Sequence, residues 1–307
     1  MSENPVTISQ INKPTGLIQA GQLMPSPTSI QSDALAGKYG QLVSLIKQME
    51  RVIVAFSGGV DSTLVLKVAL DALGRENVLA ATGVSPSLPQ RELASVKELA
   101  AVLNAPLELV ETSEMDVVNY TSNPANRCYY CKTELYSKLT DLAEEKKYQA
   151  VLNGLNLDDM GDHRPGIRSA REWGIRSPLL EAKLSKLEVR ALAEKLNLPN
   201  WEKPALACLS SRIPYGTPVT IQSLSQIEKA EDFLRDAGFT NVRVRHHTNL
   251  ARIEVDAEDL QRLLEEPLRS ELIECFKKLG YTYVTVDLQG FRSGSGNETL
   301  VNLKKLP

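Results

Sequence analysis

A glycine-rich turn between an apolar run and a helical pattern is the feature that most constrains this chain. The turn is preceded by the apolar run 51–56, followed by a helical pattern over 62–73, and reads Ser57-Gly58-Gly59-Val60-Asp61-Ser62. Two glycines let the backbone approach an anion closely, and the N–H groups and dipole of a helix start attract negative charge. No lysine follows the glycines, so the turn is not a Walker A loop. The pattern predicts a strand, turn and helix that bind phosphate.

Apolar segments alternate with helical patterns in the first two thirds of the chain. We expect strands over 78–84, 107–110 and 150–153, and helices over 35–50, 90–103 and 131–147. Such alternation predicts an α/β fold, a doubly wound parallel sheet with helices on both faces. Ligands bind these sheets at the carboxyl ends of the strands, which is where the glycine-rich turn lies.

The next stretch, 154–183, is polar and has few periodic apolar positions, so we interpret it as loops that carry chemistry. Three acidic residues in it either assist magnesium or orient arginines, or form a plain acidic loop: Asp158, Asp159 and Asp162. Ser185 and Glu188 have capping-box spacing, which predicts a helix that runs to about residue 196.

The length of 307 residues predicts two domains. Residues 1–33 are polar and aperiodic, so we expect a flexible tail there, followed by a phosphate-binding domain over 34–217. Prolines recur along the chain up to residue 218, and they suggest that the boundary between the two domains lies there. A helix over 222–237 and strands over 242–246, 251–255 and 281–287 then predict a small α+β domain over 218–307.

Net charge and hydropathy exclude some partners. The formal net charge is −3, which gives no global field for nucleic acid, and no apolar run is long enough to span a membrane. Four cysteines in a chain of this length do not make a disulfide framework. A reducing, cytoplasmic location fits, and cysteines there are more often metal-binding or catalytic.

The cysteines leave several interpretations open. Cys128 and Cys131 form a C-x-x-C pair, Cys208 lies in a loop of small residues, and Cys275 on a helical pattern is expected in the core. A redox pair would need a thioredoxin-like setting, and a zinc site would need a histidine spacing that is absent. An iron–sulfur cluster on three thiolates, or simply unpaired thiols, remain possible.

The six-residue turn resembles the PP-loop of the ATP pyrophosphatase families, which cleave ATP between the α and β phosphates. The resemblance implies that Ser57, Gly58, Gly59 and Ser62 cradle pyrophosphate and that Asp61 lies near Mg²⁺. Longer segments narrow the family: 126–136 with Asn-Arg-Cys-Tyr-Tyr-Cys-Lys, 153–166, 171–179, 208–216 with Cys-Leu-Ser-Ser-Arg-Ile-Pro-Tyr-Gly, and 287–294. Together, from about residue 35 onward, the chain resembles the LarE family of ATP-dependent sulfur transferases in nickel-pincer nucleotide cofactor biosynthesis.

The resemblance implies a substrate and a reaction. The substrate is pyridinium-3,5-biscarboxylic acid mononucleotide; ATP adenylates its carboxylates with release of pyrophosphate, and sulfur then replaces AMP. Family members with three cysteines are expected to hold a 4Fe–4S cluster, here on Cys128, Cys131 and Cys208. The alternative is that Cys208 itself donates its sulfur. Family members assemble as homo-oligomers, often hexamers, so we expect the same here.

A substrate with phosphate and carboxylates needs cations around it, and arginine forks pair well with both groups. Lys132 follows the C-x-x-C pair, and Arg212 follows Cys208 by four residues. Arg243 and Arg245 alternate on one expected strand and so face the same side, while Arg292 lies in a Gly/Ser-rich loop. We expect Lys132 to act in the sulfur chemistry and the four arginines to bind substrate; each could also be a solvated surface charge.

Three other functions compete with this one. A PP-loop tRNA thiolase would need a broad basic face for RNA, which the net charge of −3 does not favour. An ammonia-dependent amidating synthetase would not need three cysteines. A redox sensor that binds ATP and a cluster would release no pyrophosphate with any substrate.

Overall fold

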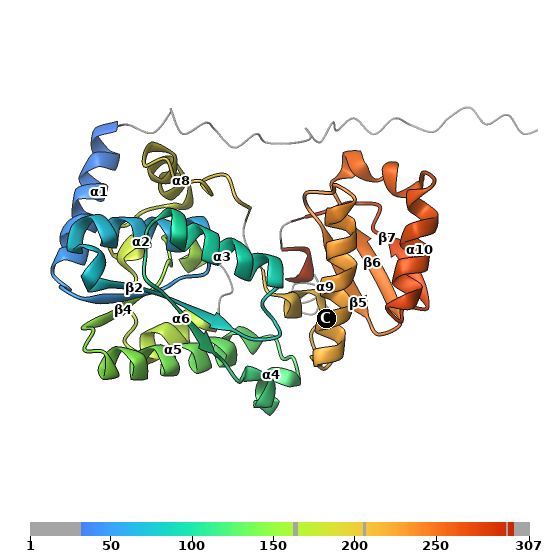
Figure 1. Ribbon diagram of the computed structural model, residues 1–307, viewed down its shortest axis with the longest axis horizontal. Coiled ribbons are helices and arrows are strands. Elements are labelled where there is room, and N and C mark those ends of the chain that lie inside the picture. Colours follow the sequence, from blue (N-terminus) through green and yellow to red (C-terminus); the bar gives the residue numbers. More distant parts are fainter. Residues whose placement is uncertain (1–31, 162–164, 205–206, 293, 298–307) are drawn as a thin grey trace, which may run out of the picture.

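The computed structural model describes residues 32–161, 165–204, 207–292 and 294–297, and its elements build two separate sheets (Figure 1). Nearly all of the expected N-terminal tail, together with Asp162, lies outside the described residues. One sheet has the strand order β3-β2-β1-β4, and the other has the order β5-β6-β7. The predicted domain boundary after residue 217 stays a prediction.

The first sheet is parallel throughout. Its strands are β1 (Val52–Ala55), β2 (Val78–Val84), β3 (Leu107–Glu111) and β4 (Ala150–Leu152). Successive side chains of a strand point to opposite faces. Val52 and Val54 therefore join one buried apolar cluster, while Ile53 joins another on the opposite face.

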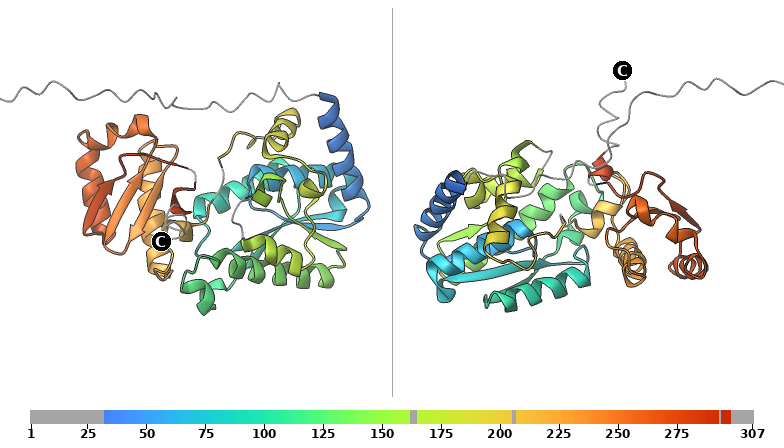
Figure 2. Two further views of the ribbon diagram at one scale, coloured as in Figure 1. Left: turned by 180° about the vertical axis from the view of Figure 1, so that it is seen from behind. Right: turned by 90° about the horizontal axis from the view of Figure 1, so that it is seen from above.

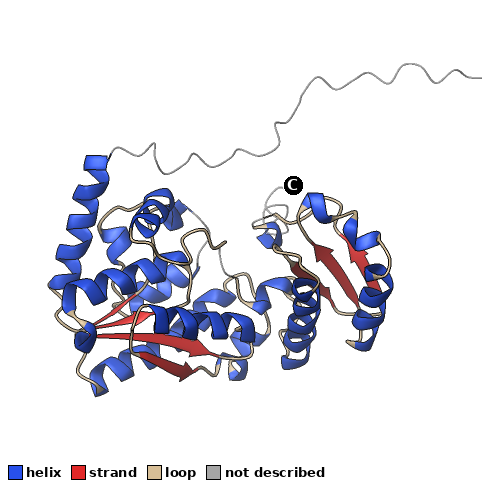
Figure 3. Ribbon diagram, turned by 45° about the horizontal axis from the view of Figure 1, so that its top comes forward, coloured by secondary structure: helices blue, strands red, loops and turns tan. Residues whose placement is uncertain are grey.

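Helices cover both faces of this sheet (Figures 2 and 3). The cluster around Val52 and Val54 is closed by α1 (Ser32–Lys47), α2 (Val60–Leu73), α3 (Gln90–Val102) and α8 (Lys186–Lys195). The cluster around Ile53 is closed by α5 (Arg127–Glu145) and α6 (Pro165–Glu172). The predicted doubly wound α/β fold is confirmed. No helix of the described residues is long and apolar enough to cross a membrane.

The second sheet separates an apolar face from a charged one. β5 (Arg243–His247) pairs antiparallel with β6 (Leu250–Glu254), which pairs in parallel with β7 (Tyr283–Val286). Val244 and Ile253 are fully buried in a cluster with α9 (Ile221–Asp236) and α10 (Leu268–Lys278). The intervening positions carry Arg243, Arg245, Arg252 and Glu254 on the other face.

Two predictions about local structure need correction. The helix expected over 131–147 begins earlier, at Arg127, so the C-x-x-C pair lies within its first turns. Tertiary contacts explain this start, since the buried Arg127 side chain donates a hydrogen bond to the carbonyl of Ser210, 83 positions away. The periodicity of α5 begins only after these residues, so it could not reveal them.

The stretch 154–183, interpreted as loops, contains α6 and the short α7 (Pro178–Glu181). Each begins with proline, which suits the first position of a helix. Packing holds α6 against α5: Ala170 is buried, and the Ser169 and Thr133 hydroxyls lie 3.0 Å apart. The capping box of Ser185 and Glu188, by contrast, is confirmed at the start of α8.

Candidate functional site

The predicted phosphate-binding turn joins the end of β1 to α2. Gly58 has a φ of +71°, which glycine adopts without strain, and Gly59 caps α2 with no side-chain hydrogen bond from the described residues. The Ser57 and Ser62 hydroxyls lie 3.2 Å apart, and Ser62 Oγ donates to the Gly59 carbonyl at 3.1 Å. The turn thus presents hydroxyls beside helix-start N–H groups, an arrangement that suits a phosphate.

Asp61 is held from two sides. Its Oδ1 accepts a hydrogen bond from Asn156 Nδ2 at 3.0 Å, and its Oδ2 pairs with the ammonium of Lys186. Two acidic residues of the 154–161 stretch support these partners, one exposed (Asp158) and one buried (Asp159). Asp158 accepts from the backbone N–H of Lys186 at 2.6 Å, and Asp159 accepts from that of Asn156 at 3.0 Å.

Sequence reasoning missed Lys186 and Asn156. Lys186 lies between Ser185 and Glu188, the two residues of the capping box, and their spacing indicates only a helix start, not a site residue. The residues present fit Mg²⁺, which usually takes one or two carboxylates along with phosphate oxygens, and Asp61 supplies such a carboxylate. Among the described residues no group of three His, Cys, Asp or Glu could hold a metal by itself.

Gly154 brings the loop after β4 against the turn. A Cβ there would lie 2.8 Å from the Ser62 nitrogen and 3.0 Å from the Asp61 carbonyl carbon, both of them backbone atoms. We expect Gly154→Ala to push the turn out of place and weaken MgATP binding about tenfold or more, by calorimetry. Gly161→Ala is the control, because a Cβ there meets no atom of the described residues within 4 Å. Equal affinities in the two variants would contradict this account of the turn.

The loop that carries Cys208 lies against the start of α5, which carries Cys128 and Cys131, because Cys131 packs against the buried cluster that contains Leu209. Burial raises the pKa of Cys131 to about 12, against the opposing positive charge of Lys132. Burial and then Cys208 raise the pKa of Cys128 as well. The chain segments around residues 131 and 208, which are 77 positions apart, therefore lie side by side.

Two cations border the thiols. Arg127 is 3% exposed and donates hydrogen bonds to Asn123 Oδ1 and to the Ser210 carbonyl, the latter at 2.9 Å. The Lys132 ammonium lies 5.8 Å from the centre of the Tyr136 ring, and both cations lower the pKa of Cys128 against the effect of burial. Arg127 was not identified as a site residue from the sequence, although its position directly before the C-x-x-C pair could have indicated a cation beside the thiols. Thiolates are the ligand type that an iron–sulfur cluster prefers, but the described residues do not present three of them as a ready metal-binding group.

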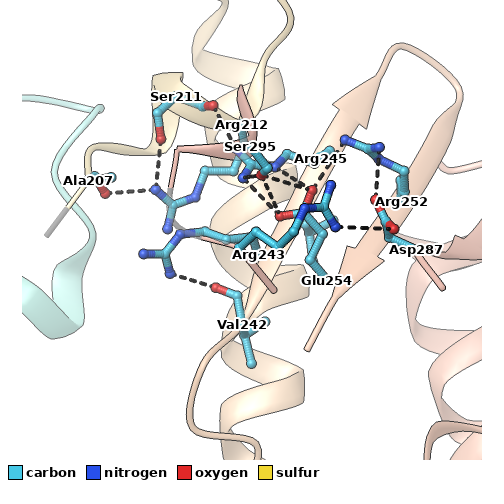
Figure 4. A network of polar contacts seen from close by, with 12 residues as sticks. Ala207, Ser211, Arg212, Val242, Arg243, Arg245, Arg252, Glu254, Asp287 and Ser295 are labelled. Atoms are coloured by element: carbon cyan, nitrogen blue, oxygen red, sulfur yellow. Dashed lines mark hydrogen bonds and ion pairs between the residues drawn. The ribbon is translucent and has the colours of Figure 1, made fainter. Parts of the chain in front are cut away.

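Arg212 holds the loop that carries Cys208 (Figure 4). Its Nη1 donates to the carbonyls of Ala207 at 2.7 Å and Cys208 at 3.0 Å. Its Nε and Nη2 donate to both oxygens of Glu231, at 2.8 and 3.0 Å, and the two side chains are 2% and 0% exposed. The predicted contact of Arg212 with substrate stays a prediction; the observed contacts position Cys208.

Arg245 ties the same loop to the second sheet. It forms a two-pronged ion pair with the buried Glu254, at 2.9 and 2.8 Å, and donates from Nη1 to the Ser211 carbonyl at 3.0 Å. Figure 4 shows Arg245 joined to both Ser211 and Glu254. Arg292 lies near Asp287, with 3.7 Å between Nη1 and Oδ1, and donates to the Gly290 carbonyl.

Arg243 differs from its neighbours because no carboxylate of the described residues lies within ion-pair distance of it. It donates to the Val242 carbonyl at 2.7 Å, and its guanidinium lies 5.1 Å from the centre of the Phe291 ring. Burial and then the positive charge of Arg212 lower its pKa to about 10, with Arg245 adding to the effect. A bound anion would relieve this repulsion, so Arg243 is the arginine best placed for a phosphate or carboxylate.

Comparison with known proteins agrees with this geometry. The sequence model of the family described as NAD synthase matches residues 41–130. An uncharacterized protein of Synechocystis sp. is 47% identical over 87% of this chain and 99% of its own length. One of Methanocaldococcus jannaschii is 31% identical over 80% of this chain and 92% of its own length.

The third relative is named for its product. Pyridinium-3,5-bisthiocarboxylic acid mononucleotide synthase of Lactiplantibacillus plantarum is 42% identical over 87% of this chain and 96% of its own length. Identity at this level over nearly all of both chains, together with the PP-loop and the cysteine site, shows that this chain belongs to the LarE family.

Proposed function

We propose that this protein transfers sulfur to the carboxylates of pyridinium-3,5-biscarboxylic acid mononucleotide at the expense of ATP. The observation that carries the proposal is a PP-loop at the start of α2 in a protein whose Cys208 loop packs against the first turns of α5, which carry Cys128 and Cys131. A carboxylate is a poor electrophile, so it needs a leaving group before sulfur can replace oxygen. The PP-loop supplies the means to make one from ATP.

The chemistry takes two displacements for each carboxylate. A carboxylate oxygen attacks the α-phosphorus of ATP, the bond between the α-phosphorus and the bridging oxygen breaks, and pyrophosphate leaves with the electron pair. A sulfide then attacks the carbonyl carbon of the acyl adenylate, the carbon–oxygen bond to AMP breaks, and AMP leaves. Two rounds convert both carboxylates to thiocarboxylates.

We infer that sulfur is supplied at a 4Fe–4S cluster held by the three thiolates, whose open iron would carry the transferable sulfide. The Lys132 ammonium and Arg127 guanidinium would balance the negative charge of thiolates and sulfide. Arg212 and Arg245 donate hydrogen bonds to backbone carbonyls of the Cys208 loop and so hold this loop in place. In the alternative route the Cβ–Sγ bond of Cys208 breaks and its sulfur is transferred to the substrate. That route assigns no chemical role to Cys128 and Cys131.

We also infer that the substrate phosphate or a carboxylate binds Arg243, which has no carboxylate of the described residues within ion-pair distance although the charge of Glu231 acts on it. Assembly into a homo-oligomer is a further part of the proposal. Its support is an exposed apolar edge beside β7, where Tyr283 is 59% exposed and Leu288 is 87% exposed. Such side chains at an open sheet edge favour association.

The test is pyrophosphate release under anaerobic conditions from ATP, Mg²⁺ and the dicarboxylate mononucleotide. We expect release only with this substrate, and product masses that show oxygen replaced by sulfur. Nicotinamide mononucleotide is the control, because it has the ring and phosphate but no carboxylate. Release that depends on tRNA or ammonia, or no release with any substrate, would refute the proposed function.

A further inference from the structure

Asn200 is a buried amide that contacts the PP-loop from far along the chain. It lies in the segment that follows α8, 142 positions after Gly58, and it is 7% exposed. Its Nδ2 donates hydrogen bonds to the Gly58 carbonyl at 3.0 Å and to Thr63 Oγ1 at 2.9 Å. The Thr63 hydroxyl in turn donates to the Gly59 carbonyl at 2.9 Å. One amide group therefore fixes the carbonyls of both glycines, one directly and the other through a hydroxyl.

The segment that presents Asn200 is itself held by two helices. From α8, Arg190 donates to the carbonyls of Trp201 at 2.8 Å and of Lys203 at 3.0 Å. From α3, Glu92 pairs with the Lys203 ammonium at 2.8 Å. The amide of Asn200 thus reaches the turn from a backbone that is fixed on both sides.

The buried amide is unfavourable in a way that packing alone does not explain. Asn200 Oδ1 is buried and has no hydrogen-bond partner among the described residues. Such an oxygen loses its hydration without replacement, which an apolar side chain would avoid. Oδ1 and Nδ2 cannot exchange places, because the Gly58 carbonyl needs a donor. The effect of the two donated hydrogen bonds on the turn therefore accounts best for this side chain.

These hydrogen bonds decide which way one peptide group points. In a trans peptide the carbonyl and the following N–H point in opposite directions. Because the Gly58 carbonyl is held toward Asn200, the Gly59 N–H points to the opposite side of the turn, and it has no acceptor among the described residues. A peptide between two glycines can flip at little steric cost, so it needs such a restraint to keep one orientation.

We propose that Asn200 is a positioning residue, which orients the Gly58–Gly59 peptide so that the Gly59 N–H binds the pyrophosphate part of ATP. This inference rests on the proposed function, in which the turn holds pyrophosphate. When the bond from the α-phosphorus to the bridging oxygen breaks, the electron pair goes to pyrophosphate. An N–H that already points at this group stabilises the added charge without reorganisation. Asn200 itself touches neither the nucleotide nor the reacting atoms.

A merely structural role for Asn200 would give different results. If the amide only satisfies a buried carbonyl, its loss should destabilise the protein and weaken the binding of every ligand of the site alike. If it orients the Gly59 N–H, its loss should weaken pyrophosphate binding far more than the binding of AMP, which lacks the β and γ phosphates. A donor restored at the same place should restore the affinity.

The experiment compares wild type with Asn200→Ala and Asn200→Asp, and the control is Glu202→Ala, which changes an exposed side chain of the same segment. Calorimetry at about pH 8 should show affinity for magnesium pyrophosphate about 10- to 100-fold lower in both Asn200 variants, with AMP affinity little changed. Glu202→Ala should bind both ligands like wild type. Circular dichroism checks that each variant is folded.

Lowering the pH should rescue Asn200→Asp selectively. This variant keeps the shape of the amide, but its ionised carboxylate has no proton to donate to the Gly58 carbonyl. Burial raises the pKa of a carboxyl group, so titration to about pH 6 should protonate it and restore a donor. Its pyrophosphate affinity should then approach that of wild type, while Asn200→Ala stays weak. Wild type measured at each pH accounts for the protonation of pyrophosphate itself.

Unchanged pyrophosphate affinity in Asn200→Ala, or equal losses for pyrophosphate and AMP, would overturn the positioning role. An Asn200→Asp variant whose affinity does not approach that of wild type as the pH falls would overturn it too, and this arm decides alone if Asn200→Ala does not fold. Wild type that binds neither magnesium pyrophosphate nor MgATP would instead refute the proposed function, because that failure precedes any role of Asn200.

Discussion

Anaerobic reconstitution with iron and sulfide should give wild-type protein a visible charge-transfer band, and replacing Cys128, Cys131 or Cys208 by alanine should each abolish it. The Cys208 loop packs against the first turns of α5, which carry Cys128 and Cys131, so the proposed cluster would draw its ligands from these two segments. We expect the same variants to lose sulfur transfer entirely while still releasing pyrophosphate, because adenylation takes place at the PP-loop.

Cys275→Ala is the matched control. Cys275 is also a free cysteine of intermediate exposure, but it packs against the cluster around α10. It should keep both the band and the activity. A wild type without a cluster would favour consumption of Cys208, and mass spectrometry should then find Cys208 converted to dehydroalanine after turnover. A band that survives any one of the three replacements would show that this thiol is not a ligand.

Glu231→Gln should lower the free energy of unfolding by about 3–5 kcal/mol. Glu231 is 0% exposed and accepts from Arg212, from Arg235 at 2.7 Å and from the Val244 N–H at 3.0 Å. Removing its charge leaves the buried Arg212 guanidinium without a counter-ion, which is costly because burial has already removed its water. The Cys208 loop, which Arg212 holds, should loosen as well.

Glu274→Gln is the control for this prediction. Glu274 pairs with Lys278 one helical turn away, but the two side chains are 68% and 73% exposed, so we expect a change within about 0.5 kcal/mol. Urea denaturation of both variants and wild type measures the difference. Equal losses, or a loss below about 1 kcal/mol in Glu231→Gln, would contradict the assignment of Glu231 as a buried counter-ion.

The same residue gives a pH dependence with a definite sign. Burial raises the pKa of Glu231, but the charge and hydrogen bonds of Arg212, with the charge of Arg235, outweigh it and leave the pKa below its ordinary value. A depressed pKa means stability that is complete above the unfolded-state value of about 4.3 and is lost as pH falls through the folded value. The stability difference between wild type and Glu231→Gln should therefore shrink on acidification below about pH 4.

The sequence alone determined the features that depend on local pattern. The order of strands and helices in the first sheet follows from apolar runs and helical periodicity, and the capping box at Ser185 is readable from four residues. The PP-loop follows from two glycines and two serines placed between a strand and a helix. These features are set by backbone sterics and by neighbours in the chain, so no tertiary information was needed.

The tertiary structure alone decided which distant residues share the site. No local pattern places the Cys208 loop beside Cys131, Lys186 beside Asp61, or Glu231 beside Arg212. Periodicity also missed the first turns of α5 and the whole of α6, because buried contacts hold these segments rather than a long apolar stripe. Burial makes such pairs necessary, because a charged side chain that is removed from water is costly unless an opposite charge lies next to it in the folded structure.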